Sequence, residues 1–143
     1  MPRFDSATGR YTYLSIDDTE YRLYFEEAGT GEIGLLLQHT AGADGRQWRH
    51  IMEDDYLGSK FRLIAYDLPY HGKSVPPTDT NWWKEEYRLE KEFLMQVPIT
   101  LARTLELDRP VYMGSSIGGH LAVDLALHHP NEFRAVVGLE ASA

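Results

Sequence analysis

The chain has 143 residues, of which 43% are hydrophobic and 25% are charged; these proportions are ordinary for a globular domain and exclude a disordered chain. The absence of cysteine excludes disulfides, thiolate metal sites and a cysteine nucleophile. The formal net charge of −8 has the wrong sign for binding a phosphate backbone, so nucleic acid is not an expected partner.

The N-terminal part of the sequence predicts a hairpin, a buried strand and a short helix. Residues 10–17 and 21–27 are rich in Tyr, Ile, Leu and Phe and are separated by turn residues, which is typical of two antiparallel strands. Residues 33–37 form an uninterrupted apolar run, as in a strand buried on both faces of a parallel sheet. Residues 44–54 are predicted to form a helix with Asp44 as its N-cap.

The remainder of the sequence alternates between predicted strands and helices. Residues 84–107 carry apolar side chains at helical spacing, and Pro98 is expected to kink or split that helix. Alternating elements predict an α/β fold with a mostly parallel sheet, whose reactive groups gather at the carboxyl ends of the strands. The other predicted elements are strands at 63–66, 111–113 and 134–139, a loop at 68–77 and a helix at 117–129.

The strongest functional signal is Gly114-Ser-Ser-Ile-Gly-Gly119, which matches G-x-S-x-G between a predicted strand and a predicted helix. A serine on such a tight turn has a strained backbone that projects its hydroxyl outward, and Gly114 and Gly118 leave room around it. Ser116 is therefore a candidate nucleophile. The amide of Ile117, at the start of the helix, is a candidate oxyanion donor. The alternative is a glycine-rich turn without chemistry.

Other polar residues are open to a functional and a structural interpretation. Asp67 and His71 could act as acid and base, but an aspartate in a Pro/Gly-rich loop is expected to bond local backbone, and His71 to pack or be hydrogen-bonded. His120, Asp124 and His128 are spaced four apart on one predicted helix face. Two histidines and one aspartate on a single helix rarely converge on one ion, so no metal site is predicted.

Two further segments carry weaker signals. Residues 38–42 (QHTAG), at the end of the third predicted strand, either supply a second backbone amide to the same oxyanion or simply connect a strand to a helix. Trp82, Trp83 and Tyr87 are expected to pack in the core or on the surface. The alternative is an aromatic-lined pocket, to which Tyr70, Trp82 and Trp83 would contribute.

In their order, these motifs resemble the N-terminal half of an α/β hydrolase, in the branch of esterases, lactonases, carbon–carbon bond hydrolases and haloperoxidase-like enzymes. Residues 35–40 (LLLQHT) are similar to the family's apolar strand that ends in His-Gly, with Thr40 in place of the glycine. Residues 67–74 (DLPYHGKS) resemble its Asp-x-x-Gly-x-Gly-x-Ser loop. Residues 114–119 resemble Gly-His-Ser-Met-Gly-Gly, and the resemblance extends from about residue 10 to residue 140.

The resemblance implies that Ser116 is the nucleophile and that the amides of Ile117 and Ala41 form the oxyanion hole. It also implies that residues 1–143 are the N-terminal portion of one core domain, with about six strands and without the cap and the C-terminal strands. The family carries its acid and its base histidine after the sixth strand, so we expect a companion C-terminal chain or fragment to supply them. Glu140 is a candidate acid at the end of that strand, and the alternative is a solvated strand end.

The expected activity is that of a serine hydrolase on a small ester, lactone or comparable carbonyl substrate, with no metal or organic cofactor. This chain alone is expected to be inactive. Carbon–carbon bond hydrolysis, cofactor-free haloperoxidase chemistry and a non-catalytic ligand-binding role are the alternatives. The sequence contains no run of eighteen apolar residues, so no membrane span is predicted. Residues 1–9 also lack the apolar core of a signal peptide. Both features favour a cytoplasmic location.

Overall fold

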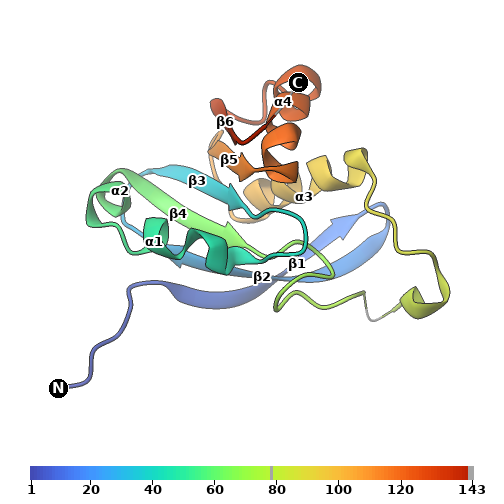
Figure 1. Cartoon of the computed structure of the whole chain (residues 1–143), viewed down its shortest axis with the longest axis horizontal. Helices are drawn as coiled ribbons and strands as arrows, with labels where there is room; N and C mark the ends of the chain where they lie inside the picture. The colour runs from blue at the N-terminus through green and yellow to red at the C-terminus, as the bar shows by residue number, and fades with distance from the viewer. Residues whose placement is uncertain (78, 142–143) are drawn as a thin grey trace.

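The computed structural model describes residues 1–77 and 79–141 and contains one six-stranded sheet with the strand order β1-β2-β4-β3-β5-β6 (Figure 1). β1 and β2 pair antiparallel, β2 pairs antiparallel with β4, and β4, β3, β5 and β6 run parallel. This arrangement confirms the predicted α/β class and its mostly parallel sheet. The strands are β1 (Thr8–Ile16), β2 (Thr19–Ala28), β3 (Ile33–Gln38), β4 (Phe61–Tyr66), β5 (Val111–Ser115) and β6 (Ala135–Leu139).

The predicted hairpin is confirmed, and its turn has a local cause. Asp17 and Asp18 have φ angles of 49° and 62°, the two consecutive positive values that a two-residue type I′ turn requires. Aspartate tolerates this left-handed conformation better than most residues with a side chain. The turn closes the ladder directly at the pair Ile16 and Thr19.

The helical segments are η1 (Gly45–Trp48), α1 (Arg49–Met52), α2 (Asp55–Lys60), η2 (Trp82–Lys84), α3 (Lys91–Thr104) and α4 (Ile117–His128). The helix predicted at 44–54 corresponds to η1 and α1, and the Asp44 side chain caps it by accepting from the Arg46 amide. α2 was not expected, because its six residues are too few to produce an apolar period. The Asp54 carboxylate caps α2 by accepting from the Leu57 amide at 2.8 Å.

The helix predicted at 84–107 is shorter than expected. It begins at Lys91, and the segment before it is a short 3-10 helix followed by extended chain. The helix does not split at Pro98, since α3 continues through it; the kink expected as the alternative stays a prediction. Proline removes one helical hydrogen bond at a cost of about 3 kcal/mol. Burial of neighbours such as Val97 and Leu101, both fully buried, offsets that cost.

Helices cover both faces of the sheet, and each face has its own hydrophobic core. α3 and α4 pack with residues such as Leu36 and Ile64 on one face, while η1 and α1 contribute Trp48 and Met52 to the other. The successive side chains of β3 alternate between these two cores, which explains why that strand is apolar throughout. Within the described residues, no helix has both the length and the apolar character that a membrane crossing requires.

Candidate active site

The register of the central strands brings three loops to one edge of the sheet. Gln38, the last residue of β3, lies opposite Tyr66 of β4 on one side and Gly114 of β5 on the other. The chain therefore leaves these three strands at neighbouring points on their carboxyl edge, where parallel sheets gather reactive groups. The segments that follow are residues 39–42, residues 67–74 and the turn at Ser116.

Ser116 occupies a strained turn between β5 and α4. Its φ is 55° and its ψ is −110°, a combination that residues with a side chain rarely adopt. Two backbone hydrogen bonds hold it in place. The Ser116 amide donates to the Leu139 carbonyl at 2.9 Å, and the Ser116 carbonyl accepts from the His120 amide at 2.9 Å. The strain expected of this turn is thus present in the structure.

Glycines make the turn sterically possible. A Cβ at Gly114 would lie 2.3 Å from the carbonyl oxygen of Gly118, far inside van der Waals contact. A Cβ at Gly118 would lie 3.1 Å from the carbonyl oxygen and the Cγ of Gln38, and one at Gly119 would lie 2.6 Å from the Leu139 carbonyl. The crowding predicted around Gly114 and Gly118 is confirmed, and Gln38 places the end of β3 against the first turn of α4.

Two of the backbone amides at this edge suit an oxyanion. Ile117 is the first residue of α4, which has no side-chain cap, so its amide is one of the unpaired donors at the positive end of the helix. In the loop after β3, the Thr40 amide donates to Gln47 Oε1 at 2.8 Å. The next amide, that of Ala41, has no hydrogen-bond partner within residues 1–77 and 79–141. Ala41 and Ile117 remain the candidate oxyanion donors.

His39 follows β3 directly, but its hydrogen bonds leave it unable to act as a base. Its Nε2 accepts from the Leu68 amide at 3.0 Å, so the proton is on Nδ1, which donates to the Thr40 carbonyl at 2.7 Å. Burial lowers the pKa of His39. The ring of His71 lies 5.1 Å from that of His39, and its Nδ1 is 3.0 Å from the Pro69 carbonyl, as the structural interpretation of this residue predicts.

The buried state of His39 makes the stability of the protein depend on pH. Its folded pKa lies below the unfolded value of about 6.5, so the unfolded chain takes up the proton first. Stability from this group is complete above pH 6.5 and falls as the pH drops toward the folded pKa, by at most about 1.4 kcal/mol per pH unit. Urea unfolding between pH 8 and pH 5 should show this loss in the wild type and a smaller loss in His39→Gln. An equal loss of unfolding free energy with falling pH in both proteins would contradict this role of His39.

The structural interpretation of Asp67 is confirmed. Its Oδ1 accepts from the Gly45 amide at 2.7 Å and its Oδ2 accepts from the Lys73 amide at 2.8 Å, with the residue only 4% exposed. Asp67 therefore ties the start of η1 to the loop after β4. Asp124, considered above as a metal ligand, accepts from Lys91 Nζ at 3.2 Å, and the described part of the chain contains no group of three potential metal ligands.

Two buried tyrosines beneath the turn were not anticipated. The Tyr112 hydroxyl donates to the Gly118 carbonyl at 2.8 Å, and the Tyr66 hydroxyl donates to Gln38 Oε1 at 2.7 Å. Burial raises the pKa of both hydroxyls, which stay protonated donors. The signal in the sequence is a tyrosine inside an otherwise apolar strand, because a buried hydroxyl requires a partner. These bonds support the first turn of α4 and the end of β3.

Glu140 directly follows β6 and is exposed, with a φ of 52°. The carbonyl of the preceding residue, Leu139, accepts from the Ser116 amide, so the chain passes the turn at this point. The role of Glu140 as the acid stays a prediction.

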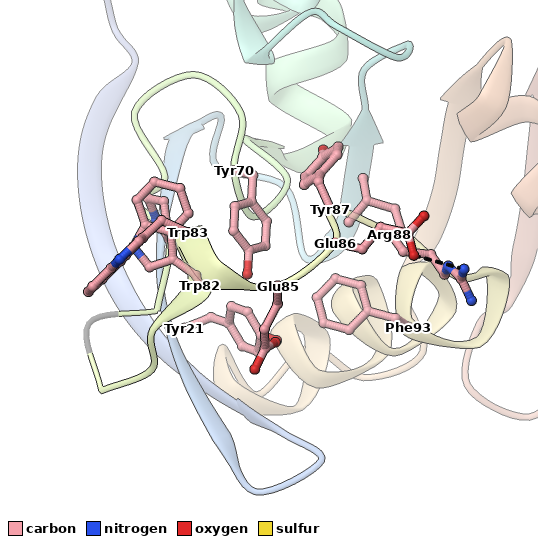
Figure 2. Close-up of a pocket in the computed structure, with 11 residues that line it drawn as sticks. Tyr21, Tyr70, Trp82, Trp83, Glu85, Glu86, Tyr87, Arg88 and Phe93 are labelled. Atoms are coloured by element: carbon pink, nitrogen blue, oxygen red, sulfur yellow. Dashed lines mark hydrogen bonds and ion pairs between the residues drawn. The ribbon is translucent and has the colours of Figure 1, made fainter.

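The tryptophans line a surface pocket. Tyr70, Trp82 and Trp83 line a cavity of about 700 Å³, as the alternative of an aromatic-lined pocket predicts. Figure 2 shows their side chains at this pocket. The exposed fractions are 41% for Trp82 and 63% for Trp83, which places both residues outside the core. The pocket is bordered by Tyr70 of the loop after β4, by Tyr21 near the hairpin turn and by Phe93 at the start of α3.

Residues 35–143 match the family described as the alpha/beta hydrolase fold. The chain belongs to the α/β hydrolase family. It is 30% identical to a 2-hydroxy-6-oxononadienedioate/2-hydroxy-6-oxononatrienedioate hydrolase from Burkholderia vietnamiensis, over 93% of this chain and 44% of that protein. It is also 30% identical to a pimeloyl-[acyl-carrier protein] methyl ester esterase from Edwardsiella ictaluri, over 84% of this chain and 41% of the esterase.

Among solved α/β hydrolases, the fold is similar to a thermophilic esterase from Thermogutta terrifontis. The TM-score is 0.74 at 25% identity, over 89% of this chain and 44% of the esterase chain. The chain therefore spans less than half the length of the hydrolases that it matches. The six strands found here are consistent with the N-terminal portion of the family's fold.

Proposed function

We propose that this chain supplies the nucleophile and the oxyanion hole of a serine hydrolase that acts on a small ester, lactone or similar carbonyl substrate. The observation that carries the proposal is the backbone of Ser116, with φ 55° and ψ −110°, between two positions that exclude side chains. Such strain persists only where the surrounding structure maintains it, and it clusters at functional sites.

In the proposed reaction, Ser116 Oγ forms a bond to the carbonyl carbon while its proton moves to a histidine base. The amides of Ile117 and Ala41 hold the oxygen that becomes negative. The carbon–oxygen bond to the leaving group then breaks, and the histidine returns the proton to the departing alcohol. Water, activated by the same base, cleaves the acyl group from Ser116. These steps need no metal or organic cofactor.

The base and the acid are proposed to come from a companion C-terminal segment. His39 lies in the loop after β3, two residues before Ala41, and both of its ring nitrogens are engaged in hydrogen bonds. β6 is an edge strand of the sheet, and its residues Val137 and Leu139 are about 40% exposed. Such an edge favours pairing with another strand, which would bring the companion segment close to the turn at Ser116.

The second candidate is hydrolysis of a carbon–carbon bond beside a ketone. The relative from Burkholderia vietnamiensis favours it, because the name of its substrate gives a ketone and two carboxylates but no ester, so hydrolysis must break a bond to carbon. The same serine and oxyanion donors suit both reactions, since each begins at a carbonyl.

A substrate panel separates these candidates. The protein in its complete form should be assayed with short p-nitrophenyl esters, an unsubstituted lactone and a 2-hydroxy-6-oxo dienoate. We expect turnover of the esters or the lactone that exceeds turnover of the dienoate. The reverse order would favour the second candidate, and no turnover of any carbonyl compound would contradict both and favour a ligand-binding role.

A further inference from the structure

The aromatic pocket is assembled from three segments that are far apart in the sequence. Tyr21 comes from the start of β2, Tyr70 from the loop after β4, and the remaining rings from residues 82–93, which run into the first turn of α3 (Figure 2). The ring of Tyr70 lies 5.3 Å from that of Tyr87 and 6.3 Å from that of Trp82, in edge-to-face arrangements. Several aromatic rings therefore border one cavity of about 700 Å³.

Tyr70 is held in the wall of this pocket by an unfavourable backbone. Its φ is 69°, in the left-handed region that a bulky side chain seldom occupies and that typically carries a penalty of about 1 kcal/mol or more. The neighbouring loop bonds maintain it, since the His71 amide donates to the Leu68 carbonyl at 3.0 Å. A glycine would satisfy this turn without strain, so the fold retains an aromatic ring here against a local cost.

The pocket also contains a carboxylate that has no basic partner among the described residues. Arg88 pairs with Glu86 at 3.1 Å and with Glu90 at 3.9 Å, which neutralises its charge. Glu85 forms no ion pair within the described residues. Figure 2 draws its side chain among Tyr21, Tyr70 and Phe93. Burial, followed by the charge of Glu85, raises the pKa of the Tyr70 hydroxyl, in agreement with this placement.

We propose that this pocket binds a small organic cation with a methylated ammonium group. Aromatic faces attract a cation through their quadrupoles, and this attraction suits a quaternary ammonium in particular. The Glu85 carboxylate supplies the opposite charge. A methylated ammonium has no N–H donors to satisfy, whereas a primary ammonium would need three acceptors from a wall that consists mainly of rings. The proposal does not depend on the hydrolase function of Ser116.

The test compares choline with 3,3-dimethylbutan-1-ol, a neutral molecule of nearly the same shape in which carbon replaces the nitrogen. Trp82 and Trp83 are two of the three tryptophans in the chain, so intrinsic fluorescence of the protein reports binding at the pocket. Choline is expected to give a saturable change, with a dissociation constant at least about threefold below that of the alcohol. Equal affinities would overturn the proposal, because the charge would then contribute nothing.

Three variants locate the binding. Glu85→Gln and Tyr70→Leu should each weaken choline binding by about two- to fivefold, the loss of one ion contact or one ring face at a partly exposed site. Glu32→Gln makes the same change in net charge in an exposed loop before β3 and should leave binding unchanged. Circular dichroism checks that each variant is folded. The proposal would be contradicted if Glu85→Gln bound choline as tightly as the wild type, or if all three variants lost the same affinity. It would also be contradicted if ethanolamine, the primary-ammonium analogue, bound more tightly than choline.

Discussion

Replacing Ser116 with alanine is expected to lower ester turnover by the complete protein by roughly 10⁴- to 10⁶-fold. The substitution removes the attacking oxygen but leaves the amides of Ile117 and Ala41 in place, so a small residual activity above the uncatalysed rate is expected. Alanine has the same Cβ as serine and experiences the same strain at φ 55°. The unfolding free energy should therefore change little. Initial rates with a p-nitrophenyl ester and a urea unfolding curve measure the two quantities.

Ser115 provides the matched control for this variant. It is the last residue of β5, is 8% exposed and pairs with Leu139 of β6 in the sheet. Ser115→Ala makes the same chemical change one residue earlier, at a position without the strained backbone of Ser116. We expect its activity to stay close to that of the wild type. Comparable losses in both variants would mean that the serines act through the fold of this segment and not through one hydroxyl.

Replacing Gly114 with alanine is expected to destabilise the protein by about 3 kcal/mol or more. The new methyl group would lie 2.3 Å from the Gly118 carbonyl oxygen and 2.4 Å from its carbonyl carbon, and backbone atoms cannot rotate away as a side chain can. Relief requires that the first turn of α4 move, which would also break the bond from the Tyr112 hydroxyl to the Gly118 carbonyl. Activity should fall together with stability, and urea unfolding measures the loss.

Gly58→Ala is the control for the glycine variant. Gly58 lies within α2, and a Cβ there would contact the Cα of Gly29 at 3.4 Å, an ordinary distance. Alanine is a better helix former than glycine by up to about 1 kcal/mol. The variant should be as stable as the wild type or slightly more stable. If Gly114→Ala were tolerated equally well, the turn would be looser than its close contacts indicate.

Much of the fold could be predicted because local chemistry determines it. The uniformly apolar run at 33–37 matches a strand buried between two cores, and the glycines around Ser116 indicate a sharp turn. The prediction failed where packing overrides local preference. α3 continues through Pro98 because that helix is buried against the sheet. The apolar residues before Lys91 belong to a pocket wall instead of a helix.

The candidate site was predictable in part for the same reason. Ser116 and its glycines form a contiguous motif, whereas the nearness of the Ala41 loop depends on the pairing of β3 with β5. The bond from Tyr112 to Gly118 also joins residues that no local pattern connects. The aromatic pocket depends on Tyr21 and Phe93 meeting from distant segments, with ring centres 5.3 Å apart. Contacts of this kind require the tertiary structure.

The oxygen of Ser116 is the proposed reactive atom of this chain. Treatment of the complete protein with a fluorophosphonate, followed by digestion and mass spectrometry, tests it most directly. We expect a single covalent adduct on the peptide that contains residues 114–119, with fragment ions that assign it to Ser116 and not to Ser115. An adduct on another residue, or no adduct in a protein that still hydrolyses esters, would contradict it.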